Sequence, residues 1–87
     1  MADEPELDME ELQHQLASFD VEPFLVATAS TIASLAHAKL EAGDLGQAKK
    51  AIDALGALIP QLEGDLAADL ALALTRLQVA YADAASG

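Results

Sequence analysis

The segment from Pro23 to Ala38 contains no Asp, Glu, Lys or Arg, although 22% of the chain is charged. A helix at the surface of a soluble protein normally carries charge on its outer side. The uncharged run of 16 residues therefore predicts a helix that neighbours cover on more than one side. A membrane span is the alternative, but a helical span needs about 20 apolar residues. This run is shorter and holds four hydroxyl residues and His37, so we expect no membrane partner.

Cap and turn residues set the limits of this helix. Asp20 is a predicted N-cap, and Pro23 lies in the first turn, where its missing N–H costs nothing. The helix should cover residues 21–41 and end at Gly43. Its expected packing face consists of residues spaced three or four apart, widened by Phe24, Ala29 and Ala36: Val21, Leu25, Thr28, Ile32, Leu35 and Lys39.

A second helix should follow Asp44, after a turn so short that the two helices form an antiparallel hairpin. Its apolar residues alternate spacings of three and four, which is typical of a seam against an antiparallel neighbour: Leu45, Ala48, Ile52, Leu55, Ile59 and Leu62. Pro60 should kink or end this helix near Ile59. Glu63, Gly64 and Asp65 form a predicted second turn and N-cap.

The third helix of the body should span about residues 66–83. Its main stripe consists of Leu66, Leu70, Ala73, Leu74, Leu77, Ala80 and Tyr81. Leu72 and Val79 fall nearly opposite this stripe, on the side that should face water. The expected fold is therefore all-α: an antiparallel helical hairpin plus a third helix in a small bundle, preceded by a short N-terminal amphipathic helix.

The acidic residues concentrate near the N-terminus. Residues 1–22 hold eight acids and no Lys or Arg, whereas residues 23–87 hold seven acids and all four basic residues, so the net charge of −11 divides into −8 and −3. We therefore separate an acidic arm, residues 1–19, from a three-helix body, residues 20–87. The arm lacks the basic and apolar segments of a targeting peptide. It is either a solubilising tail or an arm that docks on a basic surface or folds back over the body.

Part of this arm should be helical. Asp8 and Glu11 have the spacing of a capping box. Leu12, Leu16 and Phe19 follow on one helical stripe, which predicts a helix over about residues 9–18. Such a short helix is stable only when its stripe finds a surface.

Chain length and composition bound the possible functions. A chain of 87 residues forms one small domain, with a radius of gyration of roughly 12 Å when compact, and is marginally stable alone. The absence of Cys excludes disulfides and thiolate chemistry and fits a cytoplasmic location. The acidic charge argues against a nucleic-acid partner.

Residues with catalytic or metal-binding potential are few. Glu11 and His14 have the spacing of one half of a di-iron site, but such sites need further carboxylates inside a bundle. His37 and Glu41 form an i, i+4 pair at a helix end, which suits the helix dipole. The mid-helix hydroxyl groups of Ser30, Thr31 and Ser34 should bond to backbone carbonyls in the preceding turn. We expect no enzyme activity, no catalytic residue, no metal and no cofactor.

Two resemblances to known families follow from these patterns. Ile32, Leu35 and Ala36, the turn at Gly43 and Asp44, and then Ala48, Ile52 and Pro60 are similar to a single tetratricopeptide hairpin. Lys39 replaces the bulky aromatic residue of that repeat, and only one copy is present.

The second resemblance covers about residues 20–82. Phe24, Leu35-Ala36-His37, the segment from Leu45 to Asp53, Gly64-Asp65-Leu66 and Arg76 to Tyr81 resemble a small bacterial all-helical family, DUF1844, known only as a domain of unknown function. The resemblance implies a cytoplasmic bacterial helical protein and carries no activity and no site residues.

The function that we expect is non-catalytic: a helical module for protein–protein interaction, assembled as a homodimer or higher homo-oligomer. The alternatives are an acidic accessory subunit of a basic, for example ribosome-associated, partner, and a metal-binding or enzymatic protein. The expected interface residues lie on the bare side of helix 21–41, on the outer side of the third helix and on the arm: Val26, Ser30, Ala33, Ser34, Leu72, Val79, Leu12, Leu16 and Phe19.

Overall fold

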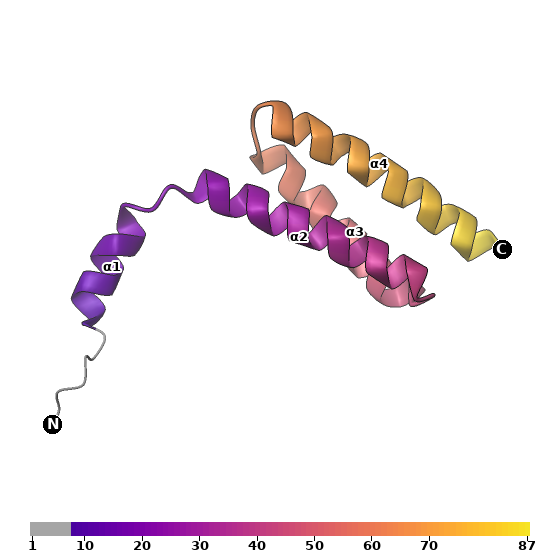
Figure 1. The fold of residues 1–87 in the computed structure, drawn as a ribbon, viewed down its shortest axis with the longest axis horizontal. Helices are drawn as coiled ribbons and strands as arrows, with labels where there is room; N and C mark the ends of the chain where they lie inside the picture. Colours follow the sequence, from indigo (N-terminus) through magenta and orange to yellow (C-terminus); the bar gives the residue numbers. More distant parts are fainter. Residues whose placement is uncertain (1–7) are drawn as a thin grey trace, which may run out of the picture.

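The computed structural model describes residues 8–87 and is all-α over that range (Figure 1). The helices are α1 (Met9–Ala17), α2 (Val21–Glu41), α3 (Leu45–Leu58) and α4 (Asp65–Ser86), with a 3-10 turn, η1 (Ile59–Gln61), between α3 and α4. Helices α2 and α3 form an antiparallel hairpin, and α4 packs on both in the direction of α2. The predicted hairpin with a third helix and a short N-terminal helix is confirmed.

The predicted caps account for most of the helix limits. The carboxylates of Asp8, Asp20 and Asp44 each accept a hydrogen bond from a backbone N–H in the first turn of the helix that follows. These bonds satisfy donors that have no partner within a helix. The α-helix α3 ends at Leu58, and the 3-10 turn η1 follows at Pro60, as expected because proline lacks a backbone N–H.

The start of α4 differs from its prediction. Gly64, rather than Asp65, occupies the N-cap position, with φ of 85° and ψ of −168°. Asp65 is the first helical residue, where its charge suits the positive end of the helix dipole. The prediction that Leu66 belongs to the packing stripe is wrong: it is 53% exposed, whereas Leu62, just before the turn, belongs to the buried core.

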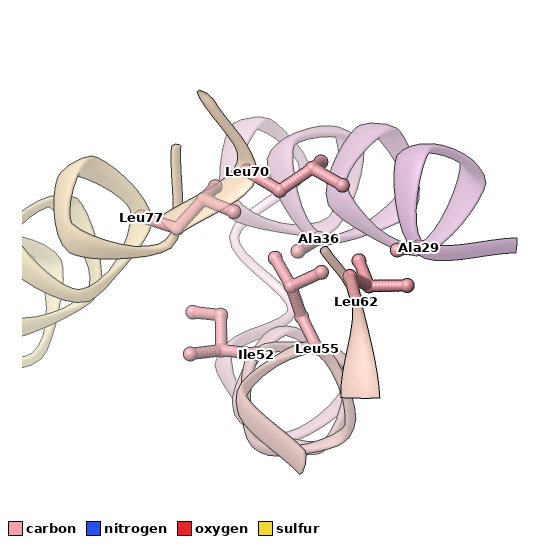
Figure 2. Packing of buried hydrophobic residues seen from close by; sticks show 7 residues of the cluster. All are labelled: Ala29, Ala36, Ile52, Leu55, Leu62, Leu70 and Leu77. Carbon is pink, nitrogen blue, oxygen red and sulfur yellow. The ribbon is translucent and has the colours of Figure 1, made fainter. Parts of the chain in front are cut away.

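A narrow core lies where the three body helices meet. Leu55 is the largest side chain that is fully buried. Tyr81 of α4 packs at the edge of this core and lines a shallow hollow together with Lys49 and Ile52 of α3. Figure 2 shows the buried cluster, in which leucines and an isoleucine of three segments meet two alanines of α2: Ala29, Ala36, Ile52, Leu55, Leu62, Leu70 and Leu77.

The expected packing face of α2 is wrong in its centre. Ala29 and Ala36 are fully buried, whereas Val21, Phe24 and Leu35 are at least half exposed. Helix α2 contacts both α3 and α4, which also contact each other. The buried side of α2 is therefore centred between these two neighbours. Small alanine side chains at that centre let both helices approach.

Helix α1 stands away from the body (Figure 1). It meets α2 at a bend of 86° and has no buried residue. The radius of gyration is 17.7 Å, well above the roughly 12 Å of a compact chain of this length. The principal extents of the chain are 60, 32 and 14 Å, so its backbone is elongated and flat.

Candidate protein-interaction surfaces

Large apolar side chains are unusually exposed for a chain with so small a core. Nine of them are at least half exposed in the part of the chain that the structure describes, and they lie on α1, α2 and α4 as well as on the α1–α2 connection. They are Met9, Leu16, Phe19, Val21, Phe24, Leu35, Leu66, Leu72 and Val79. Single exposed apolar residues are common in monomers. Groups of them on one helix face indicate contact surfaces.

The outer α4 surface contains Leu72 and Val79, which are 52% and 56% exposed. Their spacing of seven residues places them on one side of the helix, and the exposed Ala68 and Thr75 lie on the same side. The prediction that Leu72 and Val79 point away from the core is confirmed. The small neighbours leave the two larger side chains accessible to a second helix.

The bare side of α2 is divided by the structure. Val26 and Ala33 are half-buried and pack against the core of their own chain, whereas Ser30 and Ser34 are exposed. The sequence predicts that neighbours cover α2 on more than one side, and α4 of the same chain is one of these neighbours. Ala33 and Ser34 also line an open, mainly apolar groove between α2 and α4.

A groove on the other side of α2 is lined by residues that sequence analysis did not assign to an interface. This α2–α3 groove has a volume of about 220 Å³ and is lined by Ile32, Leu35 and Lys39 of α2 and by Lys50, Ala51 and Ala54 of α3, among others. The sequence predicts Ile32 and Leu35 in the packed face of α2. This is confirmed for Ile32, which is half-buried against the core, and wrong for Leu35, which is 50% exposed. The signal that could have found the groove is the pair of alanines on α3, too small to cover the larger side chains of α2.

The α1 stripe consists of Leu12, Leu16 and Phe19. Leu16 and Phe19 are 61% and 56% exposed, and Leu12 is half-buried. The Phe19 ring packs edge-on against Phe24 at the start of α2, with 6.4 Å between ring centroids. The remaining stripe is not covered by α3 or α4. The bare side of α2, the outer α4 surface and the α1 stripe are therefore three separate surfaces within one chain.

The basic residues near α3 have different surroundings. Lys49 Nζ lies 2.9 Å from Asp53 Oδ2, one turn further along the same helix. This hydrogen bond, and then the charge of Asp53, raise the pKa of Lys49 above its ordinary value of 10.5. Lys39 and Lys50 instead flank the α2–α3 groove, and neither forms an ion pair with another residue of 8–87.

The predicted pairs with chemical potential are surface pairs. His37 Nε2 and Glu41 Oε2 lie 3.6 Å apart, and both side chains are well exposed. Glu11 and His14 are exposed on α1. Within residues 8–87, no three His, Cys, Asp or Glu side chains come close enough to hold a metal ion. The Thr31 hydroxyl donates to the Ala27 carbonyl oxygen at 2.9 Å, which confirms the predicted backbone bond for this residue. Within residues 8–87, the hydroxyls of Ser30 and Ser34 form no such bond, so the prediction is wrong for them.

Over the described range, no single helix has the length and hydropathy required to cross a bilayer. Only the strongly bent pair of α1 and α2 passes that test when its two helices are counted together.

Comparison with known protein families, curated proteins and solved structures finds no match for this chain. The resemblances to the tetratricopeptide hairpin and to the bacterial helical family stay predictions. The function is therefore argued from the surfaces themselves.

Proposed function

We propose that this protein is a non-catalytic helical module that self-associates through its exposed apolar surfaces. The observation that carries the proposal is the position of Leu72 and Val79 on the outer α4 surface. Both are more than half exposed, although within residues 8–87 only one large side chain, that of Leu55, is completely buried. Full burial of a Leu or Val side chain gains roughly 1.5–3 kcal/mol. A second copy that covers this surface would add stability that the small body lacks.

The size and shape of the chain support the same conclusion. A chain of this length hides a smaller fraction of its surface than a larger domain does. Here the fraction falls further because α1 stands off the body (Figure 1) and the chain is flat, with a shortest extent of 14 Å. Small domains of this kind commonly gain stability from oligomerisation.

Sedimentation velocity of the full chain at micromolar concentration tests the proposal. We expect a dimer or larger species for the wild type and a monomer for the double variant Leu72→Asp/Val79→Asp, with unchanged helicity by circular dichroism. The control is Gln78→Asp/Ala85→Asp, which adds two charges to α4 at the same spacing but on another exposed side. A monomeric wild type refutes the proposal.

Loss of helicity in the Leu72→Asp/Val79→Asp variant would mean that these residues support the fold of one chain, and this also counts against the proposal. The milder Leu72→Ser/Val79→Ser variant separates the two effects. It should shift the sedimentation towards the monomer without a change in the circular dichroism spectrum.

A further inference from the structure

We propose that the α1 stripe of one copy docks in the α2–α3 groove of a second copy. This inference rests on the proposed self-association and specifies one of its contacts. It joins two exposed apolar surfaces, the α1 stripe with Leu16 and Phe19 and the α2–α3 groove with Leu35.

Helix α1 needs a surface to be stable. It has nine residues, and isolated helices shorter than about 12 residues are marginal in water. Within its stripe, Phe19 contacts Phe24 and Leu16 is 61% exposed, and the helix lies away from the body (Figure 1). A helix groove is the natural acceptor for such a stripe, because an amphipathic helix binds by laying its apolar face into one.

The length of α1 favours a second copy over its own chain. Leu35 lies 14 residues beyond Val21, which is about 21 Å along the α2 axis. Only three residues separate α1 from α2, so a folded-back α1 would run antiparallel from the start of α2. Leu16 and Phe19 would then lie beside the first two turns of α2, far short of Leu35. The α1 helix of another copy has no such tether.

Shape and charge both suit this occupant. Ala51 and Ala54 of α3 allow a helix to approach closely between α2 and α3. Lys39 and Lys50 stand at the groove and carry two of the four positive charges of the chain. The segment that contains α1 carries eight acids and no basic residue within residues 1–22. Complementary charge of this kind steers two chains together and fixes their orientation.

Two full-length variants separate the two halves of the contact. Leu16→Asp/Phe19→Asp alters only the stripe, and Leu35→Asp alters only the groove; all three side chains are at least half exposed, so the fold of one chain should persist. Each variant should raise the dissociation constant at least about tenfold, because a charge would enter an apolar contact. The control His14→Asp/Ala17→Asp adds two acids to the opposite side of α1 and should leave the constant unchanged.

Mixing the two variants gives the decisive measurement. A mixed pair retains one intact contact, the wild-type stripe of one chain in the wild-type groove of the other, whereas each variant alone retains none. We therefore expect the mixture to associate more tightly than either variant by itself. A charge reversal tests the role of the groove lysines. Lys50→Glu should weaken association at low salt, whereas the control Lys49→Glu should not, because Lys49 is paired with Asp53.

Each other result overturns the inference. A self-associating wild type whose stripe and groove variants associate as strongly as it does refutes this contact and leaves the proposed function intact. A monomeric wild type refutes both. A monomeric wild type that loses thermal stability in Leu16→Asp/Phe19→Asp would show that α1 packs on its own chain.

Discussion

The backbone N–H of Glu63 donates a hydrogen bond of 3.1 Å to Oε2 of Glu22, across 41 residues of sequence. This bond ties the first turn of α2 to the turn that leads into α4. It is the one side-chain hydrogen bond within residues 8–87 that joins segments distant in the sequence. The end of the bundle at which α2 and α4 begin is therefore stabilised by a polar contact as well as by the packing of Leu62 and Leu70.

Replacement of Glu22 tests this contact. Glu22→Ala removes the acceptor and should lower the free energy of unfolding by about 0.5–1.5 kcal/mol, measured by urea denaturation. Glu22→Gln keeps an acceptor oxygen at the same position and should lose less. Equal stability of the two variants would show that the bond contributes nothing.

Removal of the buried leucine should have a much larger effect. Leu55 is fully buried between α2 and α4, and Leu55→Ala should cost about 2–5 kcal/mol through lost contacts and the cavity left behind. Leu35→Ala is the control, because Leu35 is 50% exposed and should cost far less in the monomer. Chemical denaturation followed by circular dichroism, under conditions in which both are monomeric, compares them. Similar losses for the two would contradict the described core.

Two glycines should respond to Ala in opposite directions. Gly64 has a φ of 85° with extended ψ, a conformation that L residues avoid, so Gly64→Ala should cost about 1–3 kcal/mol. Gly46 lies in the first turn of α3 with open space around it, and Gly46→Ala should add up to about 1 kcal/mol. Thermal unfolding measures both changes. A stabilising Gly64→Ala would show that this turn has another backbone conformation.

The Lys49–Asp53 pair gives a prediction on pH. The hydrogen bond from Lys49 to Asp53 raises the pKa of Lys49, so the pair favours the folded state below the ordinary value of 10.5. This contribution disappears as the pH rises through the pKa of the folded state. An NMR titration of the lysine side chains should show a higher pKa for Lys49 in the wild type than in Asp53→Asn. The same pKa in both would mean that the pair does not form in solution.

The helices are predictable from the sequence because local chemistry sets their ends. Asp20 and Asp44 bond to N–H groups within the next helix, and Pro60 removes a donor from the end of α3. These effects need no knowledge of the rest of the fold. The α3 seam was also predictable, because Lys49, Lys50 and Asp53 identify the outer side of that helix.

The orientation of α2 could not be predicted in the same way. No charged residue marks its outer side between Pro23 and Ala38, so several faces are equally plausible from periodicity alone. The positions of α3 and α4 determine which face of α2 is buried, and Ala29 and Ala36 lie at the centre of that face. The α2–α3 groove escaped prediction for the same reason, since this orientation leaves Leu35 exposed in the lining of the groove.

Tyr81 packs at the edge of the core, where α4 meets α3, and it is the only tyrosine in a chain without tryptophan. The tyrosine fluorescence of the protein therefore comes from a single ring at a known helix contact. Detachment of α4 can be followed through this native emission, with no label attached to any of the surfaces under test.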